Sequence, residues 1–144
     1  MISTREAVGT ALFTALQKAT GITNAVRQLL AATDLGAANM PALEVVAKTE
    51  VAERRGVGIP IVWTIHYFAF IYASTADPGN LAETQINTLL DAVETALKPS
   101  PATGKQTLGG VVFDCRINGP IERDPGFTSG IGAAAIPIEV TITS

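Results

Sequence analysis

Two side chains in this chain of 144 residues belong to types that commonly do chemistry: the single histidine, His66, and the single cysteine, Cys115. They could form a nucleophile and its base, provided that their strands are neighbours and both side chains lie on one face. A zinc site needs three or four ligands, and this pair supplies two at most. Cys115 alternates with Val111, Phe113 and Ile117, which is typical of a small buried hydrophobic residue. His66 stands alone among aromatic residues, so we expect both residues to be structural.

Three glycine-containing stretches could bind phosphate, but none has the required frame. The stretch "TGKQT", residues 103–107, has a Gly-Lys pair without the upstream glycine of a phosphate-binding loop, and it follows a predicted helix rather than a strand. The stretches "GVG" and "SGIG", residues 56–58 and 129–132, lack the G-x-G-x-x-G spacing between a strand and a helix. We interpret all three as turns. The sequence therefore predicts no catalytic residue, no metal site and no cofactor.

Charged side chains gather in two clusters of mixed sign, although charged residues make up only 16% of the chain, against about 25% in an average globular protein. The first cluster contains Glu50, Glu53, Arg54 and Arg55, and the second contains Glu122, Arg123 and Asp124. Either cluster alone is typical of a solvated loop. Two such clusters in a chain poor in charge favour another interpretation, in which they set the register between identical subunits.

The overall composition favours a protein that associates with other proteins. Hydrophobic residues make up 47% of the chain and the mean hydropathy is +0.32, so apolar surface is left over for a partner. The net charge of −3 and the pI near 5.0 argue against general nucleic-acid binding, which needs a basic face. The longest apolar run, residues 59–73, is interrupted by Thr64 and His66 and is shorter than the roughly 18 residues of a membrane span.

The remaining global features predict one intracellular domain. The length is typical of a single domain, residues 1–144. The opening "MISTREAVGT" lacks the basic and then apolar profile of a signal peptide. One cysteine allows no intramolecular disulfide, which is usual for a protein of a reducing compartment.

Hydrophobic periodicity places these residues on helices and strands. Ser3 and Glu6 match a capping box before a helix that Gly21 ends. Asn80 and Glu83 match another, before a helix that ends near residue 97. Strands are predicted at residues 42–48, 61–74, 111–117 and 133–143, whereas residues 24–30 fit either a helix or a strand.

The order of these elements predicts an α+β fold. The strand at residues 61–74 becomes apolar on both faces towards Phe70, so we expect it to be central and covered on both sides there. Residues 49–60 are predicted to be a charged connection, and Pro137 indicates an edge or a bulge in the last strand. The expected architecture is a mostly antiparallel or mixed sheet of four to five strands with two helices packed on one face.

A succession of patterns in this order resembles a known family. They are "MPALEVV", "RRGVGIPIVWTIHYFAFIY", "LLDAVETALKP", "TLGGVVFDCRINGPIERDPG" and "AAIPIEVTI". Together they resemble the small tail-terminator and tail-completion proteins of tailed bacteriophages, with related neck components, over residues 25–143. The most specific parts are the helix that leads into "TLGG" and the C-R-I-x-G-x-I-E hairpin.

The resemblance implies a structural virion protein with no catalytic residues. Such a protein forms a homo-oligomeric ring, usually a hexamer, at the head-proximal end of the tail tube, where it ends tube growth and joins the neck. Its implied partners are the tail tube protein and a neck or head-completion protein, and DNA passes through the ring without specific binding. The protein is made in the host cytoplasm and resides in the virion. The matching positions for subunit interfaces or the ring lumen are Glu53, Arg54, Arg55, Arg116, Glu122, Arg123 and Asp124.

Three other functions stay open at this point. The chain could be a different neck or head–tail adaptor component. It could be a small enzyme that uses Cys115 and His66, in which case the thiol must be reachable and its pKa depressed. It could also be a module that binds a small molecule between its helices and its sheet.

Overall fold

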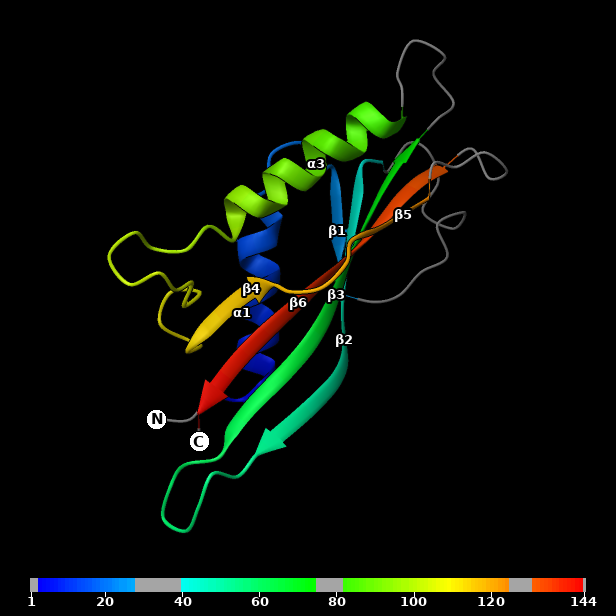
Figure 1. The fold of residues 1–144 in the computed structure, drawn as a ribbon. Helices are drawn as coiled ribbons and strands as arrows, with labels where there is room; N and C mark the ends of the chain where they lie inside the picture. The colour runs from blue at the N-terminus through cyan, green and yellow to red at the C-terminus, as the bar shows by residue number, and fades with distance from the viewer. Residues whose placement is uncertain (1–2, 28–39, 75–81, 125–130, 144) are drawn as a thin grey trace.

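A six-stranded sheet with two helices on one face forms the protein, in a computed structural model that describes residues 3–27, 40–74, 82–124 and 131–143 (Figure 1). The elements are α1 (Arg5–Gln17), β1 (Asn24–Val26), β2 (Ala42–Glu53), β3 (Val62–Ser74), α3 (Ala82–Ala96), β4 (Asp114–Ile117), β5 (Glu122–Asp124) and β6 (Ile131–Thr143). The strand order is β1-β2-β3-β6-β4, and β5 also pairs with β6. Only β1 and β2 run parallel; the other pairs are antiparallel. The predicted α+β class is therefore confirmed, with five strands in the main order.

Alternation along the strands determines which face of the sheet the helices cover. In β3, Ile65, Tyr67, Ala69 and Ile71 are buried and belong to the same core as the helices. The helices contribute one apolar stripe each: Val8, Leu12 and Leu16 from α1, and Ile86, Leu89 and Val93 from α3, with Leu97 directly after its end. Full burial of one such side chain is worth about 1.5–3 kcal/mol. The helix stripes and this face of β3 were both predicted correctly.

The start of α1 differs by one residue from the predicted capping box. Thr4 is the N-cap, and its hydroxyl accepts a hydrogen bond from the Ala7 amide at 3.1 Å. Ser3 instead donates its hydroxyl to the carbonyl of Val111, and Glu6 forms an ion pair with Arg27 at 2.6 Å. The capping box was wrong because the Ser3 hydroxyl bonds to Val111, while Thr4, which is also a favoured N-cap residue, caps the helix. The predicted cap Asn80 of the second helix lies outside the described residues.

The second face of the sheet is covered at one end of β3, as predicted. Phe68 and Phe70 point away from the helices and are only half-buried, with ring centroids 5.7 Å apart. At the strand's far end Tyr72 is buried, with Met40 and Ala42. The expectation of cover on both sides therefore holds at this end of β3, where Phe70 packs against the cluster of Met40, Ala42 and Tyr72.

Three strand boundaries differ from the sequence prediction. β2 continues to Glu53 through a bulge between Ala47 and Thr49, so most of the predicted connection is a strand. The ambiguous segment at residues 24–30 begins with the strand β1. The predicted strand at residues 111–117 begins only at Asp114.

The late start of β4 exposes Phe113, which was predicted to be buried. The chain turns tightly before it, with positive φ at Leu108, Gly109 and Gly110. This turn shifts the alternation, so Val112 is buried while Phe113 is 50% exposed. The ammonium of Lys105 lies 3.6 Å from the centroid of the Phe113 ring.

Pro137 lies in a strand that has neighbours on both sides, so the predicted edge position is wrong. The amide of Asn118 donates to the Pro137 carbonyl at 3.0 Å, which shows that this side of Pro137 faces β4 and β5. β4 pairs with Ile138–Thr141 and β5 pairs with Ala133–Ala135. The missing donor of proline therefore falls in the gap between two short strands, where no ladder bond is lost.

Candidate functional site

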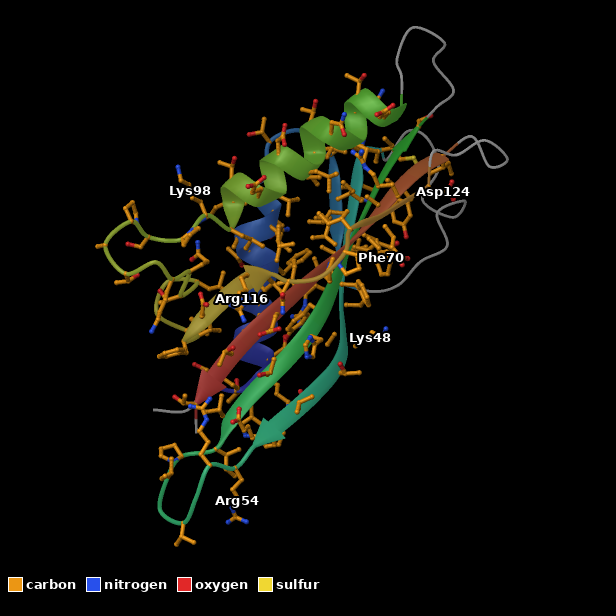
Figure 2. The ribbon with its side chains drawn as sticks, in the orientation of Figure 1. Lys48, Arg54, Phe70, Lys98, Arg116 and Asp124 are labelled. Atoms are coloured by element: carbon orange, nitrogen blue, oxygen red, sulfur yellow. The ribbon has the colours of Figure 1, made fainter. Side chains whose placement is uncertain are left out.

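The β2–β3 hairpin extends one end of the sheet, and its connection carries two of the predicted site residues (Figure 1). We define the hairpin tip as residues 54–61, between Glu53 and Val62. Arg55 pairs with Glu53 at 3.1 Å, whereas Arg54 makes no hydrogen bond or ion pair within the described part of the chain. Arg54 points away from the sheet (Figure 2). The tip thus presents a free cation.

Apolar side chains at the same tip are exposed, which the sequence prediction missed. Val57 is 104% exposed and Ile59 is 52% exposed, and Val51 on the adjoining strand is also exposed. Gly58 has a φ of +77, a conformation that glycine adopts at little cost, so it turns the chain between them. Exposed apolar residues beside charges are typical of a protein contact. The signal was present in the sequence as "GVGI" between two charged residues and a proline, but it has no periodicity.

The base of the hairpin is held against α1. The Nε atom of Arg5 lies 2.8 Å from both carboxylate oxygens of Glu50, and the guanidinium lies 4.9 Å from the centroid of the Trp63 ring. A groove of about 400 Å³ lies here, with Ser3 and Ile142 in its lining. Glu50, which the charged cluster included, therefore anchors the hairpin within the chain.

Arg116 lies on the edge strand β4, on the face away from the helices, and is bonded within the chain. Its Nη2 atom lies 3.3 Å from Oε1 of Glu139, whose other oxygen accepts from the Asn118 amide group. The hydrogen bond from Asn118, supported by Arg116, lowers the pKa of the Glu139 carboxyl despite its partial burial. His66 is the direct register partner of Glu139 on β3. The bonds from Arg116 and Asn118 to Glu139 thus link β4 and the residue after it to β6.

The cluster of Glu122, Arg123 and Asp124 forms β5, and all three residues are exposed. Arg123 donates to the side-chain oxygen of Asn87 on α3. Beside this bond lies a shallow groove of about 490 Å³, which we call the α3–β5 groove; Asn87, Leu90, Asp91, Ile121 and Arg123 line it. The cluster is therefore attached to a hollow that sequence reasoning did not find.

The seven predicted residues do not converge on one site. Glu53 lies opposite Val62, which in turn lies opposite Thr143, at one end of the β2–β3–β6 ladder. Asp124 lies opposite Ala133, which pairs with Tyr72, at the other end. Figure 2 shows Arg54 and Asp124 at opposite ends, with Arg116 between them. The sheet thus carries two separate charged surfaces rather than one catalytic cluster.

The proposed pair of Cys115 and His66 does not form. Cys115 lies beside Val140 and belongs to the core under the helices, whereas His66 lies beside Glu139 on the opposite face. Burial, with a smaller effect of Asp114, raises the pKa of the Cys115 thiol to about 12. A thiol in this state is protonated at neutral pH, so Cys115 lacks the depressed pKa that the enzyme hypothesis requires.

Within residues 3–27, 40–74, 82–124 and 131–143, no group of three or more His, Cys, Asp and Glu side chains is placed to hold a metal ion. In the same described residues, no helix is long and apolar enough to cross a membrane. No protein-family model and no curated protein sequence matches the chain.

Proposed function

We propose that the chain is a structural protein of a bacteriophage tail, namely a tail terminator. It forms a ring, which we expect to be a hexamer, at the head-proximal end of the tail tube. There it ends growth of the tube and joins it to the neck. The proposal combines the sequence resemblance with one structural observation. The protein has two exposed, charged surfaces at opposite ends of one sheet, with free apolar side chains at the hairpin tip.

Surfaces at opposite ends of a subunit suit a ring because a ring requires head-to-tail contacts. In such a contact, one patch of each subunit binds a different patch of the next, and closure follows if the rotation between subunits is right. An interface on one patch only would give a two-fold dimer instead. The net charge of −3 also supports the proposal, because an acidic ring lets the phosphate backbone pass without retaining it.

Imaging of the particle tests the proposal directly. We expect a reconstruction of the virion to place the protein between the tail tube and the neck, in one ring. Particles made without it should contain tubes of uncontrolled length that carry no heads. Absence of the protein from purified virions and purified tails would overturn the proposal.

Charge reversal in the virus gives a second test at the level of residues. A double substitution, Arg54→Glu with Arg55→Glu, should leave the monomer folded, because exposed substitutions usually change stability by no more than about 0.5 kcal/mol. It should nevertheless impair tail length control and head attachment. Lys98→Glu is the matched control, since Lys98 is exposed and far from the hairpin (Figure 2). Normal tails from the double variant would show that the hairpin tip makes no essential contact.

A further inference from the structure

The two ends of the sheet carry surfaces on which exposed apolar side chains lie beside charged ones. Val62 of β3 lies beside the hairpin tip, and Tyr72 of the same strand lies level with β5. Tyr72 is ten residues after Val62. At about 3.3 Å per residue this places the hairpin tip and β5 roughly 33 Å apart. One chain cannot bring them together, so any contact between them joins two chains.

The hairpin tip is basic, and it also exposes apolar side chains. It contains Arg54 and Arg55 and no acidic residue, and Glu53 immediately precedes it. Val57 and Ile59 are its exposed apolar side chains, and Val57 has no cover at all. Because two glycines, Gly56 and Gly58, flank Val57, the side chain stands out from a narrow turn.

The α3–β5 groove is apolar and of mixed charge, since its lining holds one carboxylate, Asp91, and one cation, Arg123. Helix α3 carries Glu83, Asp91 and Glu94 and no lysine or arginine. Leu90 and Ile121 give the groove an apolar lining, and Ile121 is 38% exposed. The cation of the groove, Arg123, is the one feature that a basic partner would not favour, and Glu53 of an incoming hairpin supplies its counter-charge by exchanging its own pairing with Arg55.

We propose that the hairpin tip of one copy docks into the α3–β5 groove of a second copy. Val57 and Ile59 then cover Leu90 and Ile121, while Arg54 and Arg55 face Asp91 and Glu94. The contact is heterologous, so it repeats from copy to copy and builds a ring or an open chain. It deepens the proposed function and rests on it, because it names both sides of the contact that the ring needs.

A charge-reversal exchange tests this contact in the purified full chain. The first variant carries Arg54→Glu and Arg55→Glu, and the second carries Asp91→Lys and Glu94→Lys. Sedimentation velocity over a concentration series should show self-association weakened by about tenfold or more in each variant, since like charges across an interface cost several kcal/mol. An equimolar mixture should associate again, because each hairpin then meets a groove of opposite charge. A mixture that stays as weak as its components would overturn the proposal.

Disulfide trapping decides the case in which the isolated chain associates too weakly to sediment as an oligomer. A chain with Val57→Cys is mixed with a chain with Ile121→Cys, and mild oxidation should link the two at least several-fold faster than it links either with itself. The native Cys115 is buried and does not compete. Val57→Cys mixed with Lys98→Cys is the control pair. Equal rates for the test and control pairs, together with no oligomer of the wild type, would overturn the contact.

The two proposals can fail separately. If the protein forms a ring in virions while the charge-reversed variants assemble normally, the ring stands and this contact is wrong. If trapping and exchange succeed while virions and tails lack the protein, the contact stands and the tail function is wrong.

Discussion

Alkaline pH should destabilise the folded protein through Cys115, which is 2% exposed. Burial raises the pKa of this thiol from 9.0 to about 12. Between these two values the unfolded chain releases the thiol proton and the folded chain retains it. The stability linked to this group is therefore fully present below pH 9 and is lost as the pH rises towards 12. The loss has a slope of at most about 1.4 kcal/mol per pH unit.

The assay compares wild type with Cys115→Ala by urea unfolding at about pH 8 and about pH 10.5, a range over which the expected loss is about 2 kcal/mol. The variant serves as the control because tyrosine and lysine side chains titrate in both proteins. The wild type should lose about 2 kcal/mol more unfolding free energy than the variant between the two pH values. A difference that does not change with pH would refute the assignment of Cys115 to the core. Rapid labelling of the native thiol by iodoacetamide near neutral pH would do so too, and would return the enzyme hypothesis.

Four further outcomes follow from the packing. Phe113→Ala should cost no more than about 2 kcal/mol of unfolding free energy by chemical denaturation, because the half-exposed ring loses mainly its contact with Lys105. Ile136→Ala, at a fully buried site, should cost about 2–5 kcal/mol in the same assay; equal costs would contradict the shifted alternation before β4. Glu139→Gln should flatten the loss of stability below about pH 4.5, because the lowered pKa of Glu139 contributes stability that disappears as the carboxyl is protonated. An unchanged acid limb of the melting-temperature profile would contradict this. Asn118→Ala should flatten the same limb in part, since Asn118 is the main cause of the lowered pKa.

The elements that the sequence predicted well are those with a sustained local period. β3 alternates from Ile65 to Ile71 and α3 has a strong apolar stripe, so both were found with the faces that they bury against each other. Prediction failed where one residue changes the phase. The bulge after Ala47 lets β2 continue through a charged segment, and the turn at Leu108 moves Phe113 to the surface. Neither event leaves a periodic signal, because each depends on how the chain meets a distant strand.

The candidate site was predictable in its members but not in its arrangement. Both charged clusters were found from composition, since charges are rare in this chain. Their positions at opposite ends follow from the registers of β3 with β6 and of β5 with β6, which are long-range pairings. Ile121 and Asp91 were missed because they form a groove only when β5 lies beside α3. The acidic face of α3 was visible in principle, as a helix with three acidic residues and no basic one.

The outer edge of β2 helps to explain why assembly would use side chains rather than strand pairing. β1 pairs with Ala42–Glu44 only, and among the described residues the rest of this edge has no second strand. Natural sheets protect such edges with charges and bulges, which prevent unspecific addition of strands. β2 has both, with Lys48 at the bulge and Glu50 and Glu53 beyond it. The outer edge of β2 is therefore protected against the addition of another strand. At this end of the sheet, the exposed side chains of the hairpin tip remain as the feature that can bind a neighbour selectively.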